Sequence, residues 1–168
     1  MLIIHTVEAL QKIINERKYS GLTGFVPTMG ALHSGHISLI KQSKSETDYT
    51  ICSIFVNPTQ FNDPNDLKKY PRPVAHDIEM LEDANCDVLF LPEVDEIYPN
   101  GSSDKKKFDF GQLDKVMEGF FRPGHFDGMA QVVDRLLEIV QPDKLFMGQK
   151  DFQQLTIVRA MLRLTGRN

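Results

Sequence analysis

The strongest constraint on the fold is the alternation of short apolar runs with longer amphipathic stretches along the chain. The short runs predict strands at Leu2–His5, 22–28, Tyr49–Val56, Asp87–Leu91 and Lys144–Met147. Between most of these runs lies a stretch with helical spacing. Strands that alternate with helices pair in parallel, because each helix carries the chain back across the sheet. We therefore expect an α/β fold with a parallel sheet and helices on both faces.

Apolar residues three and four positions apart predict the helices. They are expected from Val7, after a Thr6 cap, to near Gly21, and at His36–Ser45, Val74–Asn85, Met129–Val140 and Asp151–Thr165. Four prolines predict a loop over 57–73. Residues 92–128 are expected to be irregular, apart from a short strand at Lys107–Phe110 and a short helix at Gln112–Gly119.

Composition excludes several classes of function. The 168 residues are 41% hydrophobic and 25% charged, which is typical of one globular domain. A net charge of −4 gives no general attraction to nucleic acid. The sequence has neither the long apolar run of a membrane span nor the features of a signal peptide, so we expect a cytoplasmic protein. Cys52 and Cys86 match no metal or redox spacing and are expected to be buried thiols.

The most informative motif is Pro27–His36, which follows the apolar pair Phe25-Val26 where a strand should end and a helix begin. A helix start suits phosphate, because it presents unpaired N–H groups and a partial positive charge. Its glycines admit a ligand close to the backbone, and His33 and His36 are spaced to point from one face. The motif predicts a nucleotide site built from imidazoles and from N–H groups near Met29 and Gly30. The alternatives are purely structural histidines or a shared metal ion, although no cysteine or third histidine lies nearby.

Two further loops should meet this motif at the carboxyl edge of the sheet. Asn57–Phe61 supplies the amides of Asn57 and Gln60, which suit a polyol or simply bond the local backbone. Gly148–Gln154 supplies Lys150 for phosphate and Asp151 for ribose hydroxyls or for helix capping. In the rigid segment Arg122–Phe126, Arg122 either faces an anion or lies on the surface, and Ser102–Lys107 is expected to be a solvated loop.

Several motifs in order carry a family resemblance: Pro27–His36, Ser53–Phe61, Tyr70–Arg72, Glu96–Gly101, Arg122–Phe126, Gln141–Asp143 and Gly148–Leu155. With them the chain closely resembles the N-terminal domain of the pantoate–β-alanine ligase family, the pantothenate synthetases. The His-x-Gly-His element alone would indicate only the wider nucleotidylyltransferase superfamily. The resemblance implies that residues 1–168 form a Rossmann-like domain that binds ATP and pantoate. Because the family continues into a C-terminal lid domain, we expect an isolated, poorly active N-terminal domain.

The resemblance also implies a ligase reaction and its residues. ATP and pantoate form pantoyl adenylate, and β-alanine then displaces AMP to give pantothenate. His36 would be the catalytic donor, with His33 and Lys150. The implied ATP-binding residues are Met29, Gly30, Ala31, Leu32, His33, Ser34, Gly35, His36, Gly148, Gln149, Lys150 and Asp151. Gln60 and Gln154 would hold pantoate, with Asn57 and Met29 close by.

Three further expectations accompany this reaction. Mg²⁺ would bridge phosphate oxygens with few protein ligands, and a homodimer is typical of the family. Members usually read Gly-Glu-Lys-Asp where this chain has Gly148-Gln149-Lys150-Asp151, so no charge is expected at Gln149.

Two rival functions remain open. One is another adenylyl- or cytidylyltransferase, which would lack the amide set, and the other is a non-catalytic nucleotide-binding or dimerisation module.

Overall fold

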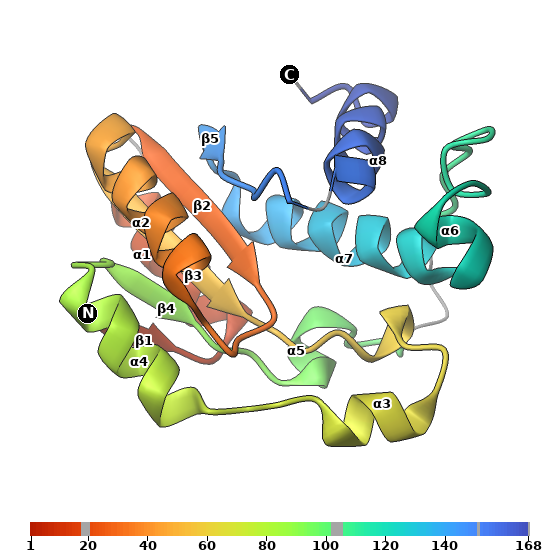
Figure 1. Cartoon of the computed structure of the whole chain (residues 1–168). Helices are drawn as coiled ribbons and strands as arrows, with labels where there is room; N and C mark the ends of the chain where they lie inside the picture. The colour runs from red at the N-terminus through yellow and green to blue at the C-terminus, as the bar shows by residue number, and fades with distance from the viewer. Residues whose placement is uncertain (18–20, 102–105, 151, 168) are drawn as a thin grey trace.

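The computed structural model describes residues 1–17, 21–101, 106–150 and 152–167. In these ranges, five strands form one sheet in the order β1-β4-β3-β2-β5 (Figure 1). The strands are β1 (Leu2–Ile4), β2 (Thr23–Thr28), β3 (Tyr49–Ile54), β4 (Val88–Phe90) and β5 (Lys144–Leu145). Every neighbouring pair is parallel, which confirms the predicted sheet.

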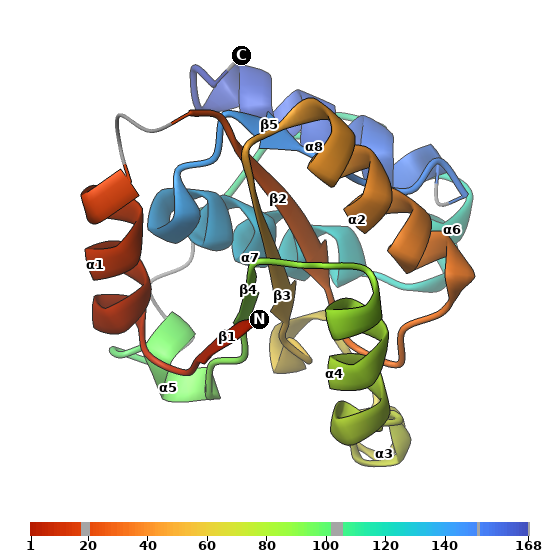
Figure 2. The ribbon, with the colours of Figure 1, turned by 90° about the vertical axis from the view of Figure 1, so that its left-hand side faces the viewer.

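Helices cover both faces of the sheet, as expected (Figure 2). The long helices are α1 (Val7–Arg17), α2 (Ser34–Glu46), α4 (Val74–Asp83), α7 (His125–Val140) and α8 (Phe152–Leu164). On β2, Phe25 packs in the cluster that contains Leu10 of α1 and Leu136 of α7, whereas Val26 packs with Ile40 of α2. Successive strand residues point to opposite sides of the sheet, so these two clusters lie on opposite faces and both faces are buried.

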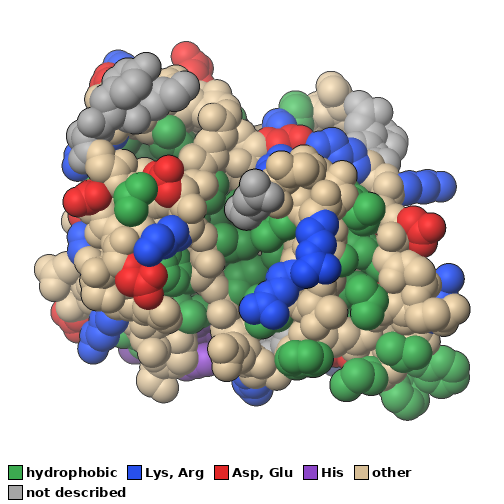
Figure 3. Space-filling model, turned by 90° about the horizontal axis from the view of Figure 1, so that it is seen from above, with side chains coloured by type: hydrophobic (Ala, Val, Ile, Leu, Met, Phe, Trp, Pro, Cys, Tyr) green, Lys and Arg blue, Asp and Glu red, His purple; other side chains and the backbone are tan. Residues whose placement is uncertain are grey.

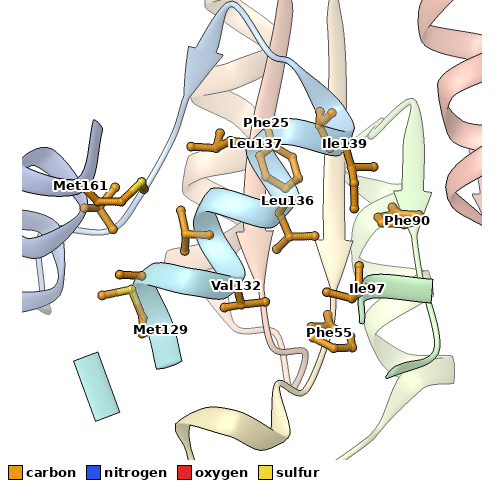
Figure 4. Packing of buried hydrophobic residues seen from close by; sticks show 14 of the residues in the cluster. Phe25, Phe55, Phe90, Ile97, Met129, Val132, Leu136, Leu137, Ile139 and Met161 are labelled. Atoms are coloured by element: carbon orange, nitrogen blue, oxygen red, sulfur yellow. The ribbon is translucent and has the colours of Figure 1, made fainter. Parts of the chain in front are cut away.

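Helix α7 is the centre of the larger core. Thirteen of its sixteen residues are buried, since the sheet lies on one side of the helix and α8 on the other. Figure 4 shows Val132 and Leu136 of α7 on the side of Phe25 and Phe90, while Met161 approaches from α8. A helix apolar over most of its surface is typical of such a central position.

Helix α7 begins at His125, so the prediction of a start at Met129 was wrong. Gly124 adopts φ +79 immediately before the helix, and Gly128 lies in its first turns. A Cβ on Gly128 would lie 2.5 Å from the carbonyl oxygen of Thr59. The glycine therefore allows the helix to pack closely on the segment η1 (Pro58–Gln60), a tertiary contact that overrides its low helix propensity.

Other boundaries also differ from the predictions. The predicted loop over 57–73 contains η1 and α3 (Pro64–Lys69), where Asp63 caps the helix and Pro64 occupies its first position. A short helix α5 (Val94–Ile97) was also missed. The predicted strand at Lys107–Phe110 is not formed, because no neighbouring strand among the described residues pairs with it. Of the predicted helix Gln112–Gly119, residues 112–117 form turns and a bend, and only the last two residues belong to a helix, α6 (Glu118–Phe121).

The structure also bears on the predictions for the cysteines and for membrane spans. Cys52 and Cys86 are free and buried, as predicted, and burial raises the pKa of the Cys86 thiol to about 11, which makes it unreactive. In the described part of the chain, no helix combines the length and the apolar character that a membrane span requires. Of the predicted loop Ser102–Lys107, residues 102–105 lie outside the described ranges.

Candidate functional site

The loops that follow β2 and β3 meet at the carboxyl edge of the sheet. Gln60 Nε2 donates to Met29 Sδ at 2.9 Å, which joins the two loops directly. The hydroxyl of Thr28, the last residue of β2, donates to the carbonyl oxygen of Ser53 at 2.7 Å. The sequence placed both loops at this edge, and these contacts confirm that they lie side by side.

The loop after β2 makes a left-handed turn. Gly30 has φ +79 and Ala31 has φ +50, so two consecutive residues lie in the region that favours glycine. A Cβ on Gly30 would lie 3.0 Å from Ile54 Cγ2 and 3.1 Å from Asp77 Oδ2. Glycine at position 30 is therefore favoured by both the backbone angle and the limited space.

Asp77, on α4, holds this turn and was missed by the sequence analysis. Its Oδ2 accepts a hydrogen bond from Ala31 N at 2.9 Å, and its Oδ1 accepts one from Leu32 N at 2.7 Å. Gly30 N donates to the hydroxyl of Thr28. The N–H group of Gly30 therefore has a partner within the loop. An acidic residue is common in the first turn of a helix, because it interacts favourably with the helix dipole. The sequence around Asp77 therefore did not indicate a contact with the loop.

The two histidines form the start of α2. His33 is the N-cap and accepts from Gly35 N at Nδ1, while His36 Nδ1 accepts from His33 N at 3.3 Å. This reciprocal arrangement is a capping box. The helix therefore begins at Ser34, two residues before the predicted start, and His36 lies one turn in.

The capping box also sets the chemistry of the rings. Because Nδ1 of each ring accepts a backbone N–H, each neutral ring carries its proton on Nε2. The ring centroids are 4.1 Å apart, so the two Nε2–H groups belong to one compact pair. Among the described residues, no group of three or more His, Cys, Asp or Glu side chains could hold a metal ion. The pair is therefore suited to donating hydrogen bonds to an anion.

Asn57 is an internal hydrogen-bonding centre. It is fully buried, and its Oδ1 accepts from Thr59 N, Thr59 Oγ1 and Tyr98 Oη. Its Nδ2 donates to Gln60 Oε1 at 3.2 Å and to the carbonyl oxygen of Gly128 at 3.1 Å. Both N–H bonds of Asn57 Nδ2 donate within the chain and Oδ1 accepts three hydrogen bonds, so Asn57 is suited to orient Gln60 rather than to touch a ligand itself. Gln60 Nε2 donates one of its two N–H bonds to Met29, which leaves the second for a ligand.

Gln60 is held from the other side by His125, whose role the sequence left open. His125 Nδ1 lies 2.9 Å from the carbonyl oxygen of Gln60, to which it donates, and both residues are buried. Tyr98 completes the set and was not singled out from the sequence. Burial raises the pKa of Tyr98, so its phenol stays protonated at neutral pH and donates to Asn57.

The third loop follows β5, which pairs directly with β2. Gly148, Gln149 and Lys150 are exposed, and Lys150 makes no ion pair with any described residue. Asp151, predicted to face ribose, lies outside the described residues. No hydrogen bond within the described ranges joins this loop to residues 29–36.

The two glutamines that follow this loop differ. Gln153 Nε2 donates to the carbonyl oxygens of Leu113 and Val116, both at 2.7 Å, and so fastens the segment before α6. The half-buried Gln154 has no side-chain hydrogen bond to another described residue, so its amide is available for a ligand. Arg122, the other open candidate, pairs with Glu118 at 2.7 Å within α6 and its C-cap.

The family model described as "Pantoate-beta-alanine ligase" matches residues 2–166. Pantothenate synthetases from Bacteroides thetaiotaomicron and Azobacteroides pseudotrichonymphae are 52% and 53% identical to this chain, over 97% and 100% of the length of the chain. The chain spans 57% and 60% of the length of these relatives.

A solved structure gives the same result for the fold. The pantoate-beta-alanine ligase from Francisella tularensis, described as complexed with beta-gamma ATP and beta-alanine, superposes with a TM-score of 0.96 at 45% identity. The alignment covers all of this chain and 64% of that one. By sequence and by fold, the chain belongs to the pantoate-beta-alanine ligase family.

Proposed function

We propose that this chain takes part in the ATP-dependent condensation of pantoate with β-alanine to pantothenate, through a pantoyl-adenylate intermediate. The observation that carries this proposal is the contact of Gln60 with Met29, which sets an oriented amide beside the loop of the histidine pair. Two other observations support it: relatives that share half of its residues are pantothenate synthetases, and a structural neighbour is described as complexed with beta-gamma ATP and beta-alanine.

Gln60 and Gln154 are the proposed contacts of pantoate, with Met29 beside them. Pantoate carries two hydroxyls and a carboxylate, and amides can donate to and accept from such groups. Gln60 is buried and its Oε1 is held by Asn57, so its orientation is set before the substrate binds. Asn57, which was expected close to pantoate, is proposed to position Gln60.

ATP is proposed to bind along residues 29–36 and 148–151. The Nε2–H groups of His33 and His36 would donate to phosphate oxygens, and Lys150 would add a positive charge. Asp151 is proposed to meet the ribose, and the neutral Gln149 adds no charge to the loop.

The reaction then requires no nucleophile from the protein. A carboxylate oxygen of pantoate attacks the α-phosphorus of ATP, and the bond to pyrophosphate breaks. The amine of β-alanine next attacks the acyl carbon of the adenylate, loses a proton and expels AMP. The protein brings two anions together and donates hydrogen bonds to charge that develops at phosphorus. One such donor contributes roughly 3–4 kcal/mol in comparable sites.

Several finer points also remain proposals. Mg²⁺ would bind to phosphate oxygens of ATP, since the described residues offer no acidic cluster for a protein metal centre. Residues 1–168 are proposed to form the domain of the family that binds ATP and pantoate. We also propose the cytoplasmic location that was expected from the sequence.

A homodimer is proposed as well. Exposed apolar side chains around α6, among them Met117, Phe120, Phe121 and Phe152, support it. In Figure 3, hydrophobic side chains gather at the edge where α6 lies in Figure 1. The molar mass in solution of the wild-type protein and of F120S/F121S tests this proposal, and a wild-type monomer would end it.

Exchange of labelled pyrophosphate into ATP tests the reaction. In the whole protein that contains residues 1–168, pantoate should accelerate this exchange, and pantothenate should form only when β-alanine is added. Exchange that depends on a different acid, or transfer from CTP, would favour another nucleotidylyltransferase. Binding of ATP without any exchange would favour the non-catalytic module.

A further inference from the structure

We propose that Asp77 is a positioning residue that holds the turn at residues 30–32 and thereby places the histidine pair. Its effect on catalysis rests on the proposed function, whereas its effect on the turn does not. Asp77 comes from α4, far from the loop in sequence, and none of its atoms is exposed.

The hydrogen-bond donors to the Asp77 carboxylate are backbone N–H groups. Its oxygens accept from the N–H groups of Ala31 and Leu32, and no Lys, Arg or His of the described residues forms an ion pair with it. Its place in the first turn of α4 adds the favourable end of the helix dipole. A carboxylate removed from water needs such partners, because a buried charge without them is strongly unfavourable.

These two hydrogen bonds act where the loop is least stable by itself. Ala31 has φ +50, which a residue with a Cβ adopts only when its surroundings enforce it. Both oxygens of one rigid carboxylate bind consecutive N–H groups, so they define the orientation of two peptide planes. Asp77 therefore stabilises the turn that the backbone would otherwise avoid.

The turn is coupled directly to the candidate site. Leu32 is held by its N–H group on Asp77 and by its buried side chain, which packs in the cluster with Ile40. The next residue is His33, the N-cap of α2 and the partner of His36 in the capping box. A shift of Leu32 would move His33 and break the arrangement of both rings. Because Asp77 is buried and both its oxygens are occupied, it acts through the backbone and does not touch substrate.

Asp77→Asn tests this inference, with Asp134→Asn as the matched control. Asp134 is also a buried carboxylate with two partners, Lys106 and Arg167, but it lies on α7 away from the histidine loop. Asparagine at position 77 keeps the size of the side chain but turns an N–H group toward a backbone N–H. We expect the Ala31 and Leu32 amides to exchange with solvent roughly 10-fold faster or more, with other α4 amides much less affected.

Kinetics separate positioning from stability. In the whole protein that contains this chain, D77N should lower the rate of adenylate formation at saturating substrates by about 10- to 100-fold, because small displacements of catalytic groups have effects of that size. The dissociation constant of ATP should change much less. D134N should reduce the midpoint of urea unfolding at least as much, yet leave that rate within about twofold of wild type at a temperature where all proteins are folded.

Two results would overturn the inference: unchanged exchange of the Ala31 and Leu32 amides in folded D77N, or equal losses of rate in D77N and D134N. If D77N does not fold, Gly30→Ala decides instead. The Cβ of this alanine would press on Asp77 Oδ2 from the loop side, so the Ala31 and Leu32 amides should again exchange faster with solvent. Unchanged protection of both amides would refute the inference. If the wild-type protein shows no pantoate-dependent exchange of pyrophosphate, the proposed function fails, and the amide measurement still tests the role of Asp77 in the turn.

Discussion

Replacement of Asn57 by alanine should weaken both the fold and the binding of pantoate. The substitution removes the hydrogen-bond partner of the half-buried Tyr98 hydroxyl and one of the partners of the Gly128 carbonyl, which lies within α7. A buried polar group left without a partner costs about 1–3 kcal/mol, so the loss at Tyr98 should lower the free energy of unfolding by roughly 1–3 kcal/mol. Urea unfolding measures this loss. Asn62→Ala, at an exposed position of the same segment, should stay within about 0.5 kcal/mol of wild type.

The effect on pantoate is expected to pass through Gln60. Gln60→Ala removes a proposed contact and should weaken pantoate by about 5- to 150-fold, which corresponds to about 1–3 kcal/mol. Asn57→Ala releases Gln60 Oε1 and should weaken pantoate as well. In a double-mutant cycle measured by titration calorimetry, the change at Asn57 should have little further effect once Gln60 is alanine. Additive effects would show that Asn57 acts on pantoate without Gln60 and would refute this reasoning.

Three other predictions concern the remaining charged and ionisable groups. His36→Ala should lower the rate of adenylate formation by roughly 10²–10³ while changing the ATP dissociation constant much less, and an unchanged rapid-quench rate would contradict its catalytic role. Lys150→Ala should weaken ATP or slow adenylation, so if calorimetry and kinetics both match wild type its assignment fails. Burial alone would raise the pKa of Asp134, but Arg167 and Lys106 together lower it. Its contribution to stability should therefore be present at neutral pH and be lost as the pH falls through its lowered pKa, and Asp134→Asn should flatten this acid limb of the stability profile.

The parallel sheet and the location of the histidine motif could be predicted from the sequence, because both depend on local information. Strand and helix periodicities are written within a few residues, and an alternation of the two types leaves few ways to bury their apolar faces. The glycines and histidines of Pro27–His36 likewise lie next to the strand that positions them. Even there, the first helical residue was misplaced, since His33 was not expected to act as a cap.

The connections that organise the site were decided only by the tertiary structure. Asp77 and Ala31 are 46 residues apart, Tyr98 and Asn57 are 41 apart, and His125 and Gln60 are 65 apart. Each pair meets because helices and loops return to one edge of the sheet, and nothing in the local pattern of either partner signals the other. The early start of α7 has the same origin, since Gly128 is favourable there only because η1 packs against it. Periodicity specifies which face of an element is buried, but the partner of a buried polar group depends on how the whole chain packs.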